Sequence, residues 1–266
     1  MFEWRNIEKG PPRVPRGYRA YAVGDIHGRL DLLNQLLALI EKDIERRPAR
    51  KALLIFLGDL IDRGPDSRGV VERLRTYRHD PLRTFFLGGN HEEVLLRLLA
   101  GERGILASWL KFGGAECLKS YGVDPADLNG QSEGRSLATI KEAIPENHAE
   151  FIGNFADTVS LGDYLFVHAG IRPRVDLSLQ SQTDLRWIRS PFLEDEDDHG
   201  FVVVHGHTIR DGVDERPNRI GIDTGAYRTG VLTALGLEGD ERWTLDTASV
   251  GNETASRLVG NETATN

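Results

Sequence analysis

Five short polar motifs constrain the fold of this chain more than any other feature, because four of them directly follow an apolar stretch typical of a β-strand. Each motif combines glycine with carboxylate, amide or imidazole side chains, the groups that divalent metals bind. Side chains from several strand ends can converge at one edge of a sheet, as in two-metal hydrolytic sites. We therefore expect an α/β protein with a metal centre at its strand ends. The motifs are Gly24-Asp25-Ile26-His27-Gly28, Gly58-Asp59 with Asp62-Arg63-Gly64, Gly89-Asn90-His91-Glu92, His168-Ala169-Gly170 and His205-Gly206-His207-Thr208.

The first hundred residues alternate between strand and helix patterns. Apolar runs predict strands, and apolar residues at three- and four-residue spacing predict amphipathic helices. This order favours parallel strands joined by right-handed crossovers, and such sheets bind ligands beyond the carboxyl ends of their strands. Three of the motifs lie there. The strands are expected over residues 18–23, 52–57 and 84–87, and the helices over 30–44, 65–77 and 94–99.

The later part of the chain carries weaker patterns. Residues 102–155 favour helices, with a surface loop at 124–135 where Gly, Asp, Asn and Ser accumulate. The acidic run 194–198 lacks the spacing of a calcium loop and is expected to be a solvated loop. Short apolar runs predict a second, largely antiparallel sheet packed on the first, with strands over 163–167, 201–204, 219–222, 230–237 and 242–245.

The domain organisation follows from the contrast between the patterned part of the chain and its end. One catalytic domain is expected over residues 1–249, since α/β domains of this size are common as single units. Residues 250–266 repeat Val-Gly-Asn-Glu-Thr-Ala and have little apolar area to bury. We expect them to form a flexible, low-complexity tail.

Composition argues against several classes of protein. The net charge of −8 disfavours unspecific binding to nucleic acid, which depends on basic surfaces. No apolar run reaches the ~18 residues of a membrane-spanning helix, and residues 1–19 are too charged for a signal peptide. The lone Cys117 has no second cysteine to pair with and no adjacent base that would make it a nucleophile. We expect a cytoplasmic enzyme without nucleic-acid or membrane partners.

Six residues in the motifs are candidate metal ligands. Asp25 and His27 are two positions apart, so both can face one metal in extended backbone. Asp59 leaves the neighbouring strand, and its two carboxylate oxygens could bridge two cations ~3.5–4 Å apart. An amide oxygen and two imidazoles complete the set: Asn90, His168 and His207.

Three further residues are predicted to be catalytic without binding metal. His91 directly follows the ligand Asn90, so its imidazole should project over the metal pair and protonate a leaving oxygen. Asp62 could accept the other ring N–H of His91 and raise the pKa of that imidazole. Arg63 offers a planar guanidinium suited to phosphoryl oxygens.

Together these motifs resemble the phosphoprotein phosphatase family within the calcineurin-like metallophosphoesterases, over residues 18–245. The chain is similar to lambda-type serine/threonine phosphatases and to symmetrical diadenosine tetraphosphatases. The resemblance implies two mixed β-sheets packed as a sandwich flanked by helices. It also implies two divalent metal ions, manganese first, with iron or zinc as alternatives. The first metal would be bound by Asp25, His27 and Asp59, and the second by Asp59, Asn90, His168 and His207.

Three details of the motifs refine the resemblance. Phosphodiesterase relatives carry Gly-His-x-His, whereas this chain has Ile209 at the last position, which favours the phosphatase branch. His205 is expected to support the site and not to bind metal. A second phosphate-binding arginine is expected beside Arg63, and both Arg172 and Arg189 are candidates.

The substrate is less constrained than the chemistry. The leading interpretation is a phosphomonoesterase for phosphoserine or phosphothreonine in proteins, which also accepts small phosphate esters. The alternative is hydrolysis of dinucleoside polyphosphates, which needs the same metals and a longer groove. A metal-binding scaffold without activity is disfavoured because His91, Asp62 and Arg63 accompany all the ligands. A nuclease is disfavoured by the acidic charge and by Ile209. The sequence does not indicate an oligomeric state.

Overall fold

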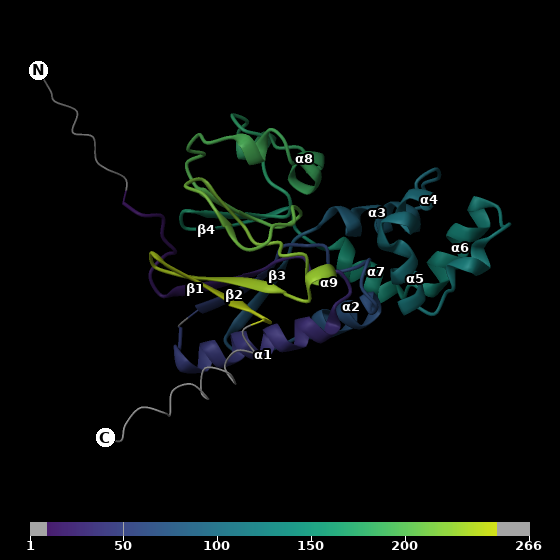
Figure 1. The fold of residues 1–266 in the computed structure, drawn as a ribbon, viewed down its shortest axis with the longest axis horizontal. Coiled ribbons are helices and arrows are strands. Elements are labelled where there is room, and N and C mark those ends of the chain that lie inside the picture. Colours follow the sequence, from purple (N-terminus) through teal and green to yellow (C-terminus); the bar gives the residue numbers. More distant parts are fainter. Residues whose placement is uncertain (1–9, 50, 249–266) are drawn as a thin grey trace, which may run out of the picture.

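Two five-stranded β-sheets pack face to face in the computed structural model, with helices on both outer sides and in a lobe beside them (Figure 1). The structure describes residues 10–49 and 51–248, so the expected tail at 250–266 lies outside the described residues. The predicted sandwich of two mixed sheets flanked by helices is confirmed. None of the helices in the described ranges is both long and apolar enough to cross a membrane.

The first sheet has the order β10-β9-β1-β2-β3. β1, β2 and β3 are parallel, as the sequence predicted. β9 pairs antiparallel with β1, and β10 pairs antiparallel with β9, so assigning these two strands to the second sheet was wrong. They form a hairpin that returns to the open edge of β1. The strand bounds are β1 Tyr18–Val23, β2 Lys51–Phe56, β3 Leu82–Phe86, β9 Thr233–Glu238 and β10 Glu241–Asp246.

The second sheet has the order β4-β5-β6-β8-β7. Its three central strands are parallel, and only its edge strands β4 and β7 pair antiparallel, so the expected largely antiparallel sheet was wrong at its centre. Parallel neighbours need a long crossover, and residues 168–201 with helix α8 provide one between β5 and β6. The strand bounds are β4 Thr158–Leu161, β5 Tyr164–Val167, β6 Val202–His205, β7 Asp214–Glu215 and β8 Arg219–Gly221.

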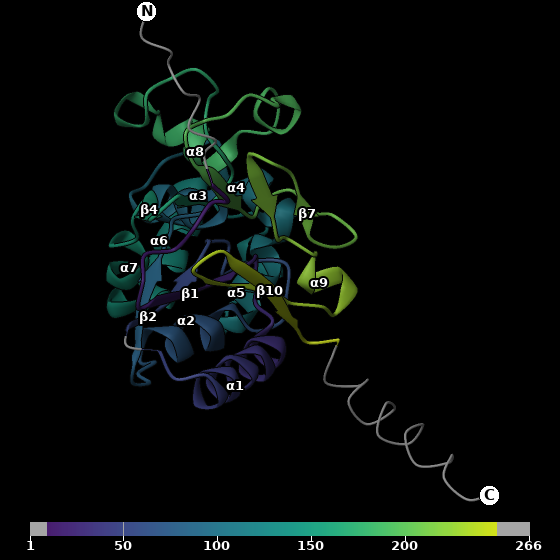
Figure 2. The ribbon, with the colours of Figure 1, turned by 90° about the vertical axis from the view of Figure 1, so that its left-hand side faces the viewer.

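Helices cover the sandwich above and below, as Figure 2 shows for α1 and α8. Helices α3 to α7 form the lobe beside the sheets in Figure 1. The expected loop at 124–135 holds a short 3₁₀ turn, Pro125–Leu128, and the start of α6. The helix bounds are α1 Leu30–Arg46, α2 Ser67–Arg75, α3 Asn90–Leu99, α4 Leu106–Trp109, α5 Ala115–Ser120, α6 Glu133–Ala143, α7 Glu146–Gly153, α8 Gln182–Trp187 and α9 Ala226–Thr229.

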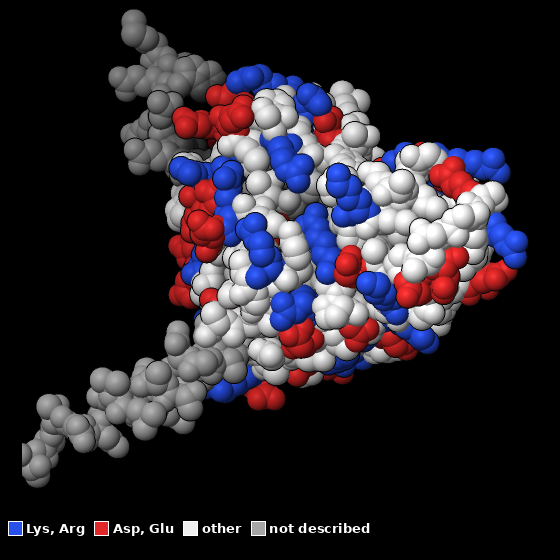
Figure 3. Space-filling model, turned by 45° about the vertical axis from the view of Figure 1, so that its right-hand side comes forward, with Lys and Arg blue, Asp and Glu red and all other residues white. Residues whose placement is uncertain are grey.

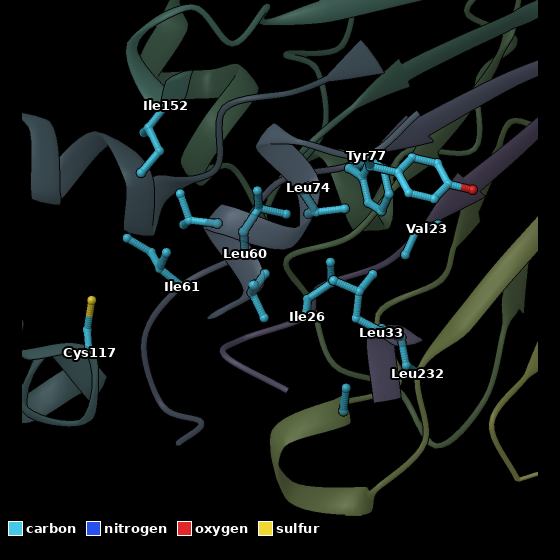
Figure 4. Close-up of a cluster of buried hydrophobic side chains, with 14 of the residues drawn as sticks. Val23, Ile26, Leu33, Leu60, Ile61, Leu74, Tyr77, Cys117, Ile152 and Leu232 are labelled. Carbon is cyan, nitrogen blue, oxygen red and sulfur yellow. The ribbon is translucent and has the colours of Figure 1, made fainter. Parts of the chain in front are cut away.

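The core anchors the loops that carry the motifs. One apolar cluster fills the space between the first sheet and its helices, and includes Val23 at the end of β1 and Leu33 of α1 (Figure 4). Leu60 and Ile61, which directly follow Asp59, belong to the same cluster and are fully buried. Because a buried leucine or isoleucine contributes about 1.5–3 kcal/mol, these two side chains hold the loop after β2 in place.

Candidate active site

The carboxyl ends of five strands carry the candidate metal ligands to one edge of the sandwich. All six side chains are nearly or completely removed from solvent. Asp25 and His27 follow β1, Asp59 follows β2, Asn90 begins α3 after β3, His168 follows β5 and His207 follows β6. The strand-end rule used for the sequence therefore places these residues in one buried region.

Asp59 lies between two groups of potential ligand atoms. Its Oδ2 is 3.6 Å from His27 Nε2, and its Oδ1 is 3.4 Å from His168 Nε2. Asn90 Oδ1 lies 3.1 Å from the same His168 nitrogen. Asp59 belongs to both groups whose ligand atoms lie within 4.8 Å of one another: His27, Asp59 and His91, and Asp59, His168 and His207. This is the geometry expected of a bridging carboxylate.

The imidazoles of these groups are oriented by backbone carbonyls. His27 Nδ1 donates to the carbonyl of Ile61 at 2.8 Å, and His168 Nδ1 donates to that of Leu57 at 2.8 Å. A carbonyl can only accept, so both rings carry the proton on Nδ1 and direct the lone pair of Nε2 inward. Burial lowers the pKa of His27 and His168, and that of His207 to about 3, which keeps all three rings neutral.

Two buried ring nitrogens without a hydrogen-bond partner in the described part of the chain make these residues suitable for binding a cation. The Nε2 atoms of His27 and His207 are buried and have no hydrogen-bond partner among the described residues. Buried polar atoms almost always have a partner, and a neutral imidazole nitrogen next to a carboxylate is the donor set of a divalent metal.

Asp25 adds a carboxylate on the side of His207, and Asp223 adds another. The backbone N–H of His207 is 3.1 Å from both oxygens of Asp25, which lies outside the two groups just described. Burial, followed by the charges of Asp223 and Asp59, raises the pKa of Asp25 well above its usual range. Burial also raises the pKa of Asp223, to about 6. Several buried carboxylates this close together favour a multivalent cation.

The sequence interpretation missed Asp223, although a signal was present. Asp223 is 2% exposed and directly follows the strand predicted at 219–222, so the rule used for the other ligands applied to it as well. Its carboxylate accepts the backbone N–H of Gly225 at 2.9 Å, at the turn that leads into α9.

Glu92 was part of a motif but had no assigned role. Its buried carboxylate accepts the backbone N–H groups of Asp59 and Leu60, both at 2.8 Å, and that of Gly89 at 3.0 Å. It therefore joins the loop after β2 to the start of α3. Burial and the charge of Asp59 raise the pKa of Glu92 to about 7.

The backbone of the site is locally strained. Six non-glycine residues with positive φ occur in the described ranges, and all but Arg174 belong to the motifs: His27, Asp59, Asp62, Arg63 and His207. Such conformations cost of order 1–3 kcal/mol each and persist only where the surrounding structure enforces them. Glycine is required beside two ligands, because a Cβ at Gly89 would collide with Asp59 and one at Gly206 with Asp25.

His91 is positioned by Asp62 at the opening of the site. Its Nδ1 is 2.6 Å from Asp62 Oδ2, which also accepts the indole N–H of Trp109 at 2.9 Å. The opposite nitrogen, Nε2, lies 3.0 Å from a guanidinium nitrogen of Arg63 and 3.9 Å from Asp59 Oδ2. Burial lowers the pKa of His91, but the carboxylates of Asp59 and Asp62 outweigh it, so the net shift is upward.

The three predicted arginines have different surroundings. Arg63 and Arg189 line the same cavity as His91, and neither forms an ion pair within the described ranges. Arg172 does not line that cavity, and its guanidinium binds both oxygens of Asp184 at 2.9 and 2.5 Å. Tyr227 of α9, which the sequence interpretation missed, packs its ring 4.9 Å from the Arg63 guanidinium.

His205 and Cys117 lie beside the metal groups and belong to neither. The His205 Nδ1 contacts the carbonyl of Gly206 at 3.0 Å, and burial lowers its pKa to about 4. Cys117 is fully buried, and burial raises the pKa of its thiol well above the usual value. A protonated, inaccessible thiol is unsuited to nucleophilic attack.

Comparison with known proteins shows the family of the chain. The sequence profile of the calcineurin-like phosphoesterases matches residues 18–229. The chain belongs to this family. Members of this family use divalent metals, and the His and Asp groups of this chain could bind them.

The chain is similar to two kinds of phosphoesterase. Serine/threonine-protein phosphatase 1 of Salmonella typhimurium is 38% identical over 35% of this chain and 38% of its own length. The symmetrical bis(5'-nucleosyl)-tetraphosphatase of Janthinobacterium sp. is 24% identical over 82% of this chain and 92% of its own length. The asymmetrical enzyme PrpE of Halalkalibacterium halodurans is 28% identical over 80% and 87%.

The extent of these matches differs among relatives. The chain aligns with 38% of the length of the Salmonella phosphatase and with 26% of a tetraphosphatase from Legionella pneumophila. A crystal structure described as a candidate diadenosine tetraphosphatase has a TM-score of 0.61 over 89% of this chain and 98% of its own. Its 22% identity makes this a likeness of fold.

Proposed function

We propose that this phosphoesterase hydrolyses dinucleoside polyphosphates, with a phosphoprotein as the second candidate substrate. The observation that carries the proposal is a pair of cavities that meet at Arg63. One, of about 610 Å³, runs from His91 toward Trp187. The other, of about 620 Å³, runs from Arg63 toward Arg29 and Tyr227. A phosphorus inside a polyphosphate chain carries a substituent on each side, whereas a terminal phosphomonoester carries only one.

The described residues fit two divalent cations, whose place would be between the imidazoles and carboxylates around Asp59. His27, Asp59 and Asp25 would hold one, and Asp59, Asn90, His168 and His207 the other. When bound, such cations supply activation of the attacking water and neutralisation of phosphoryl charge. Manganese remains our first expectation, with iron or zinc as alternatives.

The residues of the chain account for binding and proton transfer. Arg63 and Arg189 line the cavity of His91, have no carboxylate partner among the described residues and would bind the equatorial phosphoryl oxygens. Water attacks phosphorus as the bond to the leaving oxygen breaks, and the Nε2 proton of His91 passes to that oxygen. Asp62 fixes the ring through Nδ1 and stabilises its protonated form. Since Arg63 also contacts Nε2, binding of phosphate to Arg63 would free this nitrogen.

Relatives support both candidate substrates to different extents. Two tetraphosphatases, those of Janthinobacterium sp. and Halalkalibacterium halodurans, match over 82% and 80% of this chain and over most of their own length. The tetraphosphatase of Legionella pneumophila matches over 30% of the chain. The phosphatase from Salmonella has the higher identity but covers 35% of the chain. Ile209, which replaces the last histidine of the phosphodiesterase motif, is compatible with either substrate.

A direct comparison of substrates tests the proposal. Purified protein loaded with manganese would be assayed on diadenosine tetraphosphate, a phosphoserine peptide and p-nitrophenyl phosphate. We expect kcat/KM for the dinucleotide to exceed that for the peptide by about tenfold or more. A preference for the peptide would replace our proposal with the protein phosphatase. Hydrolysis of neither, with both metals present, would contradict both.

A further inference from the structure

One side of the cavity beside His91 is aromatic and takes no part in the proposed proton transfer or phosphate binding. Phe112 and Trp187 both line it, with 60% and 36% of their surfaces exposed. Among the large apolar side chains of the described ranges, only Leu179 is more exposed, at 74%, and it does not line this cavity. Aromatic rings left in solvent around one cavity indicate a ligand surface.

The backbone fixes the position of both rings relative to the catalytic residues. Phe112 lies in a turn, Leu110–Gly114, whose Gly113 carbonyl accepts the backbone N–H of Arg63 at 3.0 Å. Gly113 has a φ of +117°, and a Cβ there would collide with Arg63, so this turn packs directly on the phosphate-binding segment.

Trp187 is held from the other side of the cavity. Its backbone hydrogen-bonds the His207 ring, and its indole N–H donates to Glu93 at 3.2 Å. One aromatic wall is thus tied to Arg63 and the other to a candidate metal ligand. A ligand that fills the cavity would therefore have its ring at a set distance from the phosphate.

Charge and apolar surface alternate along the cavity. Arg63 and Arg189 form no ion pair within the part of the chain that the structure describes, whereas the third arginine, Arg97, is neutralised by Glu102 and Glu93. Figure 3 shows basic side chains in the middle of the face that it draws. A ligand that carries phosphate next to a planar ring satisfies both parts of the cavity.

We propose that the aromatic cavity, defined by Phe112, Trp187, Ile105 and Val94, binds the nucleobase of the leaving nucleotide. The base stacks on Phe112 and Trp187 while Arg63 and Arg189 hold its phosphates. Stacking is tolerant of base identity, because every base has a π-face. The inference rests on the nucleotide substrate proposed above and adds the residues that recognise its base.

Binding of two non-hydrolysable anions to the manganese-loaded protein tests the base site. The methylene analogue of ADP carries ribose and a base on its phosphonates, whereas methylenediphosphonate carries neither, so the Phe112 variants isolate the part of the difference that is due to the base. We expect the ADP analogue to bind about 5- to 150-fold more tightly, the usual worth of one stacked base. Phe112→Ala should remove most of this difference and leave the affinity for methylenediphosphonate unchanged. Phe112→Leu should resemble Phe112→Ala if the ring is needed, and Phe112→Tyr should restore binding.

Leu179→Ala is the matched control, since it also truncates an exposed apolar side chain but lies outside the cavity. It should leave both affinities unchanged. Equal binding of the two anions by the unaltered protein would overturn the base site. An equal loss of affinity for both anions in Phe112→Ala would also overturn it. So would full retention of the preference for the ADP analogue by Phe112→Leu, which would indicate a surface for peptide side chains.

The two proposals fail separately. Preference for the ADP analogue without cleavage of diadenosine tetraphosphate would retain the base site and refute the proposed substrate. Cleavage of diadenosine tetraphosphate without such a preference would retain the substrate and refute the base site.

Discussion

The metal groups and the aromatic cavity border the same phosphate site but are built in opposite ways. The candidate ligands are 0–8% exposed, and their side chains are oriented by hydrogen bonds to buried backbone. Phe112 and Trp187 are 60% and 36% exposed, and their side chains are held by a single hydrogen bond, from the Trp187 indole to Glu93. Groups that perform chemistry need sub-ångström placement, whereas a stacking surface needs only a ring at the right distance. The division suggests that reaction and substrate choice can change independently.

Asp59→Asn should have the largest effect, because it alters the residue shared by both metal groups. The amide loses the charge and one of the two anionic oxygens. We expect both metals to be largely lost, with activity falling further than the ~10²–10⁴-fold that proton transfer alone is worth. Elemental analysis and kcat would be measured together. Retention of two metals per chain would show that Asp59 does not bridge.

His91→Asn separates a proton donor from a ligand, since His91 lies in one metal group yet faces the cavity. As a general acid, it should be needed most for basic leaving groups. We expect both metals to stay and kcat to fall ~10²–10⁴-fold on a phosphoserine peptide, with a much smaller loss on p-nitrophenyl phosphate. Equal losses would indicate stabilisation of charge, and loss of a metal would make His91 a ligand.

The pH dependence of kcat provides a second test of His91 as the general acid. An acid must be protonated to act, so activity should fall as pH rises through the pKa of His91. That pKa is raised above 6.5, because the carboxylates of Asp59 and Asp62 outweigh burial. The alkaline fall should therefore begin above the usual range of histidine and disappear in His91→Asn. A fall that persists unchanged in the variant would belong to another group.

Arg189→Ala and Arg172→Ala test which arginine completes the phosphate site. Arg189 lines the cavity and has no ion-pair partner among the described residues, whereas Arg172 is bound to Asp184 and 50% exposed. Loss of a charged hydrogen bond costs about 1.5–3 kcal/mol, so kcat/KM should fall about 10- to 150-fold for Arg189→Ala. Arg172→Ala should change it little. The opposite ranking would move the second phosphate contact away from the aromatic cavity.

The contrast between the buried candidate ligands and the exposed aromatic cavity also explains which features could be predicted from the sequence. The parallel strands and the ligand set were readable because apolar runs end directly at glycine-flanked polar residues, as at Asp25 and Asp59. The direction of the strands in the second sheet was not readable, since it depends on which edges remain open after the first sheet forms. β9 pairs with β1 across more than 200 positions and brings β10 with it, a choice made by tertiary packing.

The aromatic cavity could not be predicted from the sequence for a related reason. Phe112 and Trp187 lie in segments that the sequence assigned to packing helices or to no element. An exposed aromatic residue has no periodic signature, and only the close approach of Gly113 to Arg63 reveals where Phe112 lies.

Glu92 and Asp223, in contrast, could have been predicted from the sequence. Both follow the strand-end pattern, and applying it consistently would have found them.

We expect treatment of Cys117 with an alkylating reagent to have the smallest effect. It tests whether the buried region behind Asp62 is closed to solvent. Its thiol is fully buried near Asp62, and burial raises its pKa well above the usual value. Alkylation requires an accessible thiolate, so iodoacetamide should leave the folded protein unlabelled and fully active. Mass spectrometry would follow labelling, and the same chain in denaturant, where its one cysteine is exposed, provides the control. Rapid labelling of the folded protein with loss of activity would mean that the region behind Asp62 opens. The contrast between a closed catalytic half and an open aromatic cavity would then not hold.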